Sequence, residues 1–241
     1  MLTALGNLIT SGNGVNLLTT MIIIPAALAF FMLIIPKRIY AVQAVLFLLV
    51  TAVNLLLAIA LFFVDNMTML IPWAGFEINL ALRVYDFSQL MILIAACFIF
   101  GVGLYAVSFV RNKAYSGQFF FYYLITLALV NGAFLANNMV VMLFFWEGLL
   151  VTLFGMIIIG NKEKPAAAVK ALVLNGTADL LLMLGIAITC MQAGTMMMDV
   201  ITDVPMEGLG ILGFICMMLG AAGKAGSMPF HSWIPDAADQ A

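Results

Sequence analysis

The chain has 241 residues, of which 66% are hydrophobic and only 8% are charged, and its mean hydropathy is +1.20. Soluble domains carry about 45–50% apolar and about 25% charged residues, so the composition excludes a soluble enzyme. The formal net charge of −2 offers no electrostatic footprint for an acidic partner such as nucleic acid. We therefore expect an all-α integral membrane protein embedded in the lipid bilayer.

Seven stretches of the sequence are apolar enough to cross a membrane, which takes about 20 helical residues. We expect a single membrane domain over residues 1–241, with N-terminal helices and a hairpin in 1–110 and a second part in 119–241. The predicted spans are 16–35, 40–64, 88–110, 119–136, 138–160, 166–192 and 208–227.

The loops between these spans alternate in charge. Basic residues follow the first, third and fifth spans, whereas the other loops are acidic. Because basic loops stay in the cytoplasm, we expect a multi-pass protein of the cell inner (plasma) membrane with its N-terminus outside. The basic residues are Lys37, Arg38, Arg111, Lys113, Lys162 and Lys164.

One loop has the pattern of a β-hairpin. In residues 78–85 the larger apolar side chains recur at every second position, which is the period of a strand. The preceding Pro72-Trp73-Ala74-Gly75 is typical of a turn. We expect a short hairpin on the outer face, with Trp73 and Tyr85 at the depth of the membrane interface.

A few ionisable residues lie inside the predicted spans: Glu147 in the fifth, Asp179 in the sixth and Lys224 in the seventh. A charge at the bilayer centre costs at least about 2.5–3.5 kcal/mol, so these groups are expected to pair or to bind a proton. We expect Glu147 and Lys224 to approach to ion-pair distance or across one water. The alternative for the pair is that it only orients helices, and the alternative for Asp179 is that it orients Lys170 or Lys224. For Lys170, the alternative is that its stem reaches the membrane interface.

The seventh span contains glycines beside its lysine. Gly220, Gly223 and Gly226 are three residues apart and Pro229 follows, which predicts a broken helix next to Lys224, because transporters build ion sites from unwound membrane helices. The glycines are also compatible with close helix packing, and both roles can hold together.

Cysteine and histidine, the side chains that most often bind zinc or iron–sulfur clusters, are few in this sequence. Cys97, Cys190 and Cys216 lie in apolar runs, and His231 is the only histidine. This set does not supply a zinc site or an iron–sulfur cluster, so we expect no cofactor within this chain. His231 is open to two interpretations, a proton carrier or an ordinary hydrogen-bonded histidine at the interface.

Four segments resemble a known family. Residues 144–148, 170–179 and 220–237, together with the entry to the third span at 84–88, resemble the antiporter-like subunits of respiratory complex I, of membrane-bound (group 4-type) hydrogenases and of multi-subunit Na⁺/H⁺ antiporters. The order and spacing of these segments match the family over nearly the whole chain.

The resemblance implies roles for the ion-translocation candidates Glu147, Lys224, Asp179, His231 and Lys170. The separation and approach of Glu147 and Lys224 would drive proton movement, Asp179 would tune or relay, and His231 would connect the site to an aqueous half-channel. Redox chemistry would take place in other subunits, where iron–sulfur clusters or a Ni–Fe site are expected, so the chain is not expected to be an enzyme by itself.

Family members usually carry a second, inverted repeat, and this sequence ends at Ala241 where that repeat begins. The resemblance therefore implies an incomplete antiporter-like repeat over 119–241. It leaves three possibilities: a partner chain that supplies helices eight onward, a truncated sequence, or a reduced form of the family.

These observations predict a membrane subunit that translocates H⁺ or Na⁺ in a redox-driven pump such as a membrane-bound hydrogenase or a ferredoxin-oxidising complex. Its partners would be other membrane subunits and peripheral redox subunits. The alternatives are a subunit of a gradient-driven Na⁺/H⁺ antiporter and a structural subunit that completes the membrane arm without its own ion path.

Overall fold

The computed structural model describes residues 14–72, 79–160 and 165–240. Within the chain there are two compact units, Met1–Ala136 and Asn137–Ala241. The predicted turn residues Trp73, Ala74 and Gly75 lie outside the described ranges, and so do Lys162 and Lys164.

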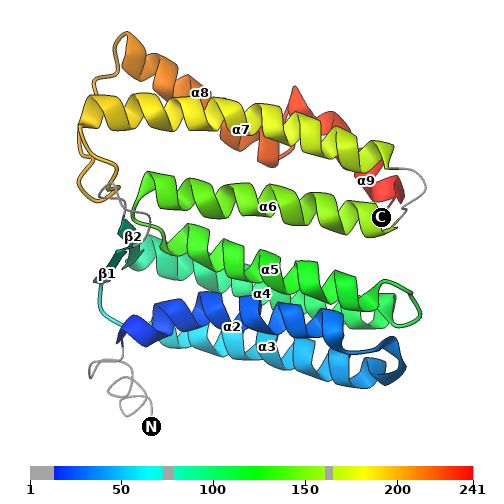
Figure 1. Cartoon of the computed structure of the whole chain (residues 1–241). Helices are drawn as coiled ribbons and strands as arrows, with labels where there is room; N and C mark the ends of the chain where they lie inside the picture. Colours follow the sequence, from blue (N-terminus) through cyan, green and yellow to red (C-terminus); the bar gives the residue numbers. More distant parts are fainter. Residues whose placement is uncertain (1–13, 73–78, 161–164, 241) are drawn as a thin grey trace. The chain divides into compact units, whose positions relative to one another are not determined.

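The first unit is built from long apolar helices and one hairpin (Figure 1). Its helices begin and end within a few residues of the predicted spans, because hydropathy largely sets the length of a membrane helix. The elements are α2 (Gly14–Ile34), the 3₁₀ turn η1 (Lys37–Ile39), α3 (Tyr40–Leu61), β1 (Met67–Pro72), β2 (Asn79–Val84), α4 (Asp86–Val110) and α5 (Ser116–Leu135).

Buried polar side chains tie the helices of this unit together. The amide of Asn131 on α5 donates to the carbonyl oxygen of Met21 at 2.8 Å and to Oδ1 of Asn54 at 2.7 Å. Aromatic packing also joins α3 to α5, since the rings of Phe47 and Phe120 stack with centroids 4.5 Å apart. One asparagine thereby links α5 to both α2 and α3.

The predicted hairpin is confirmed. Strands β1 and β2 pair antiparallel, with Met67 opposite Val84. Gln89 on α4 donates to the carbonyl oxygens of Leu61 at 3.0 Å and Val64 at 2.9 Å, which satisfies acceptors left open where α3 ends. The basic turn η1 and the turn between α4 and α5 lie at the opposite ends of these helices from the hairpin (Figure 1).

The second unit contains three longer helices followed by short helical segments (Figure 1). The side chain of Asn138 accepts a hydrogen bond from the amide of Val140 at 2.8 Å and so caps the first of these helices. The elements are α6 (Met139–Gly160), α7 (Ala166–Ala193), α8 (Leu209–Lys224), η2 (Phe230–Ser232) and α9 (Trp233–Gln240).

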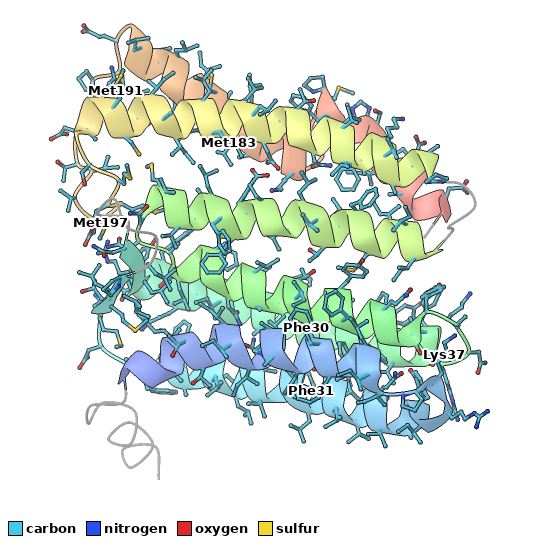
Figure 2. The ribbon with its side chains drawn as sticks, viewed as in Figure 1. Phe30, Phe31, Lys37, Met183, Met191 and Met197 are labelled. Carbon is cyan, nitrogen blue, oxygen red and sulfur yellow. The ribbon has the colours of Figure 1, made fainter. Side chains whose placement is uncertain are left out.

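Large apolar side chains are exposed on helices of both units. Phe30 and Phe31 on α2 and Met191 on α7 are more than half exposed, and Figure 2 labels them on their helices. A soluble protein rarely exposes a continuous surface of this kind. Among the described residues, six helices are long and apolar enough to cross a membrane, and α8 is a shorter apolar helix.

The seventh predicted span is the one that differs most from the structure. The prediction placed it at 208–227 with Lys224 deep inside, but α8 has 16 residues and Lys224 is its last residue. The helix cannot continue beyond this point in the same form, because Gly226 has a positive φ of 66°, a conformation that favours glycine. The predicted break therefore follows Lys224 directly.

Candidate ion-translocation site

Close packing of α8 against α7 positions the lysine. A Cβ atom added at Gly223 would lie 2.1 Å from Cβ of Ala178, and one added at Gly220 would lie 2.5 Å from Cβ of Leu182. Only glycine permits such an approach, so these two residues have the packing role that the sequence left open. The consequence is that Lys224, next to Gly223, lies beside the α7 residue that follows Ala178.

That residue is Asp179, and it forms an ion pair with the lysine. Lys224 Nζ lies 3.1 Å from Asp179 Oδ2, with side-chain exposures of 14% and 2%. A buried charge is costly unless it is paired and hydrogen-bonded, and here each charge neutralises the other. Of the two partners that the sequence left open for Asp179, the structure shows Lys224.

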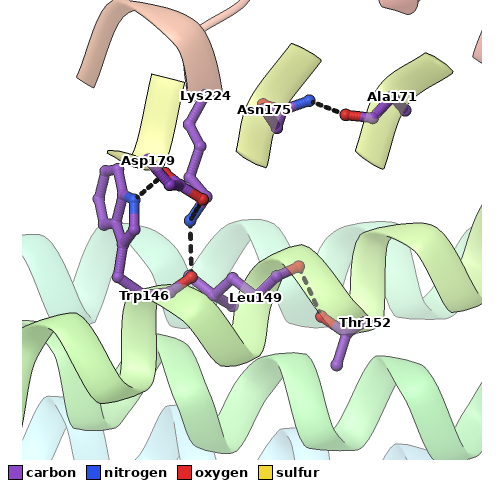
Figure 3. Close-up of polar contacts among 7 residues, drawn as sticks. All are labelled: Trp146, Leu149, Thr152, Ala171, Asn175, Asp179 and Lys224. Carbon is purple, nitrogen blue, oxygen red and sulfur yellow. Dashed lines mark hydrogen bonds and ion pairs between the residues drawn. The ribbon is translucent and has the colours of Figure 1, made fainter. Parts of the chain in front are cut away.

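Trp146 on α6 contacts both members of this pair (Figure 3). Its indole Nε1–H donates to Asp179 Oδ1 at 2.8 Å, and its backbone carbonyl accepts from Lys224 Nζ at 2.6 Å. The ammonium nitrogen also lies 4.4 Å from the centroid of the Trp146 rings, within the range of a cation–π contact. The ion pair is therefore held from three helices, α6, α7 and α8.

Glu147 follows Trp146 on α6 and carries the second carboxyl group of the site. Its Oε1 is buried and has no hydrogen-bond partner among the described residues. The ammonium of Lys224 is paired with Asp179, on the helix against which α8 packs, and the predicted direct ion pair of Lys224 with Glu147 is not found among the described residues. An approach of Glu147 and Lys224 across one water stays a prediction.

Lys170 belongs to a separate ion pair nearer the start of α7. Its Nζ lies 2.7 Å from Asp236 Oδ2 on α9, with side-chain exposures of 40% and 46%. His231 is exposed on η2, just after Pro229. The structure thus brings Asp179 and Lys224 together and places Lys170 in a more accessible contact.

Two contact residues were not assigned a role from the sequence. Trp146 stands in the segment that carries Glu147, and Asp236 stands in the segment that carries Lys224. An indole N–H one residue before an intramembrane glutamate was the available signal for the first. Asp236 gave no comparable signal, because its partner lies 66 residues away in the sequence.

The described residues of the site include groups that carry or accept charge. Across the described ranges, no group of three or more His, Cys, Asp or Glu side chains is arranged to hold a metal ion. What the site does contain is one buried ammonium bound to one carboxylate, with a second carboxyl group on the adjoining helix. Such a group can exchange one partner for another and so move charge over a short distance.

The second unit of the chain matches a known protein family. Residues 136–241, which include the whole of the second unit, match the family described as NADH:quinone oxidoreductase/Mrp antiporter, TM. Residues 136–241 therefore belong to the antiporter-like subunit family. The putative antiporter subunit mnhA2 of Staphylococcus epidermidis is 29% identical over 178 residues, which is 69% of this chain and 22% of that protein.

Subunit L of the NADH-quinone oxidoreductase of Mycobacterium tuberculosis is a second relative. It is 31% identical over 178 residues, covering 69% of this chain and 27% of that protein. The chain therefore spans about a quarter of the length of these curated relatives.

Solved structures show the same fold. The Mrp complex from Dietzia aligns with a TM-score of 0.79 at 18% identity, over 93% of this chain and 25% of that one. Respiratory complex I from Thermus thermophilus aligns with a TM-score of 0.76 at 20% identity, over 91% and 46%. The archaeal membrane-bound sulfane sulfur reductase aligns with a TM-score of 0.74 at 20% identity, over 93% and 48%.

Proposed function

We propose that this chain is an ion-translocating membrane subunit of a complex I-like, redox-driven pump such as a membrane-bound hydrogenase or a ferredoxin-oxidising complex. The observation that carries the proposal is the buried Asp179–Lys224 ion pair beside the carboxyl group of Glu147, whose buried Oε1 has no hydrogen-bond partner among the described residues. Ionisable groups within membrane segments mark ion pathways as a rule. The transported ion is H⁺ or Na⁺.

The mechanism that follows is an exchange of partners at Lys224. In one state the ammonium is bound by Asp179, as in this structure; in the other it moves toward Glu147, and the change in local charge releases or accepts a proton. Lys170, paired with Asp236, and the exposed His231 would connect the site to water. Moving one charge against 100 mV costs about 2.3 kcal/mol, so a redox step must supply the work.

The partners proposed for the chain follow from this need for an energy source. Peripheral subunits that contain iron–sulfur clusters or a Ni–Fe site would carry out the electron transfer, and this chain would not be an enzyme by itself. Other membrane subunits, including one that supplies helices eight onward, would complete the ion path. The relatives support such partners, since their names describe subunits of larger assemblies.

A gradient-driven Na⁺/H⁺ antiporter subunit is the second candidate. The observation that favours it is the likeness to Na⁺/H⁺ antiporter subunit A1 of Staphylococcus epidermidis, 27% identical over 142 residues, or 56% of this chain and 18% of that protein. Both candidates use the same buried ion pair and differ in the energy source that drives ion transport. A structural subunit without its own ion path is the third candidate, and it requires no transport role for Glu147.

The variant Glu147→Gln tests the proposal, because it keeps the shape of the side chain and removes the charge. We expect ion uptake by vesicles that contain the assembled complex to fall about a hundredfold or more, which is the lower end of the range typical of lost proton-transfer groups, while the amount of assembled complex is unchanged. The control is Asp203→Asn, which neutralises an exposed carboxylate in a loop. Uptake at the wild-type rate in Glu147→Gln would favour the structural subunit.

Identification of the partners separates the two driving forces. We expect a gentle detergent purification followed by mass spectrometry to recover subunits with nickel–iron or iron–sulfur motifs and a membrane chain with the later helices. Recovery of antiporter subunits alone would instead support the gradient-driven exchanger.

A further inference from the structure

We propose that Trp146 is the positioning residue of the ion pair: its indole N–H keeps Asp179 bound while Lys224 leaves. This inference rests on the proposed function, since it concerns the step in which the lysine changes partner. It assigns a role to a residue that carries no charge.

Asp179 is held by a hydrogen bond at one carboxylate oxygen and by an ion pair at the other. Trp146 binds Asp179 Oδ1, whereas Lys224 binds the other oxygen, Oδ2. The two donors therefore do not compete for one acceptor. When the ammonium moves away, Oδ1 keeps its hydrogen bond and the carboxylate is not left without a donor.

The movement of Lys224 away from Asp179 has an energetic cost. A buried acceptor that loses its only donor bears the full desolvation penalty, and hydrogen bonds to charged groups are stronger than neutral ones. Asp179 is 1% exposed, so solvent does not replace a lost partner there. The indole N–H lowers the barrier for release of Lys224 because one bond to the carboxylate persists throughout.

Trp146 also holds the lysine. Its carbonyl accepts from Lys224 Nζ, and its ring face lies beneath the same nitrogen. Because Glu147 is the next residue along α6, the carbonyl that holds the ammonium belongs to the peptide bond leading to Glu147. Trp146 therefore supplies a holding point between the present partner of the lysine and the proposed one.

The chain offers a matched control for this role. Trp233 is a second half-buried tryptophan of the same unit, and its Nε1 has no hydrogen-bond partner among the described residues. Tryptophan to phenylalanine removes the same atoms at both positions. Only at position 146 does it remove a hydrogen bond to the ion pair.

The functional experiment compares Trp146→Phe with Trp233→Phe in the assembled complex. We expect ion uptake to fall about tenfold in Trp146→Phe, as the loss of a charge-assisted hydrogen bond implies, and to stay at the wild-type rate in Trp233→Phe. Wild-type uptake in Trp146→Phe overturns the proposal. Equal losses in both variants also overturn it, because they would show that ring packing alone matters.

A spectroscopic experiment tests the hydrogen bond independently of transport. The ultraviolet resonance Raman difference between the wild-type complex and Asp179→Ala isolates the indole N–H band that responds to this carboxylate. We expect that band to report a strong hydrogen bond, which Asp179→Ala abolishes. A band that does not change in Asp179→Ala overturns the proposal, and this result decides the matter if Trp146→Phe does not assemble.

The two sets of experiments separate this inference from the proposed function. Loss of uptake in Glu147→Gln together with wild-type uptake in Trp146→Phe contradicts only the role of Trp146. Wild-type uptake in Glu147→Gln with an altered indole band in Asp179→Ala contradicts the proposed function and leaves the hydrogen bond established.

Discussion

Asp179 and Lys224 show how strongly the stability of the fold depends on single ionisable residues in apolar helices. Each side chain is almost fully removed from water, so either one would be an uncompensated charge without the other. Removing one partner of a buried pair is far more costly than replacing both with neutral groups. The pair is therefore expected to behave as a unit.

This coupling predicts strongly non-additive effects on stability. We expect Asp179→Asn and Lys224→Gln each to destabilise the protein by about 3–5 kcal/mol, and the double variant to lose far less than the sum. The unfolding temperature of the purified complex measures these differences. The half-exposed pair Lys170–Asp236 is the control, because exposed pairs contribute only about 0–1 kcal/mol; a strictly additive result at Asp179 and Lys224 would contradict the coupling.

For single residues, the sequence indicated which ionisable side chains belong to the candidate site. It did not specify fully which of them pair with one another. Glu147, Asp179 and Lys224 stand out because charges are rare in apolar spans. Which carboxylate meets the lysine depends on how α7 and α8 face one another, and a single sequence does not specify that rotation. Asp179 was one of the partners considered for Lys224, whereas the direct pair with Glu147 is not formed.

At the scale of the elements, the contact between α7 and α8 governs the site. Glycine residues let the two backbones approach, and the end of α8 then delivers its lysine to α7. Packing and placement of the charge thus have the same cause. The sequence predicted the glycine pattern and the break, but the helix ends three residues earlier than expected because the turn at Gly226 follows Lys224 closely.

A methyl group at this contact is therefore expected to be harmful. We expect Gly223→Ala to lower the free energy of unfolding by about 1–3 kcal/mol, the usual cost of overpacking, since its Cβ would lie 2.1 Å from that of Ala178. The second change Ala178→Gly should restore much of the loss by making room. Gly101→Ala is the control, because a Cβ there meets no atom within 4 Å. Thermal unfolding equal to wild type in Gly223→Ala would show that the helices do not pack in this way.

At the scale of the whole molecule, the chain consists of apolar helices joined by charged turns. In the first unit the basic turns and the hairpin lie at opposite ends of the helices (Figure 1). The spans and the hairpin were predictable because hydropathy and alternation are local properties of the sequence. The division at residue 136 was not, since the polar pair Asn137-Asn138 read only as a short break between two spans.

The charge pattern predicts the orientation of the chain in the membrane. We expect a cysteine at position 113 to react with a membrane-impermeant maleimide only from the cytoplasmic side, and a cysteine at position 203 only from the outside, because basic loops are retained in the cytoplasm. The background replaces Cys97, Cys190 and Cys216 by alanine, so that labelling reports the new positions alone. Labelling from the reverse sides would contradict an external N-terminus.

The central claim is that the buried charges move ions, and one measurement addresses it most directly. The double variant Asp179→Asn, Lys224→Gln removes both charges while keeping similar volumes and hydrogen-bonding groups, so the complex should still assemble. Ion uptake is then measured in vesicles that contain this variant. We expect an assembled complex that no longer takes up ions, and uptake at the wild-type rate in the assembled double variant would contradict a transport role for these charges.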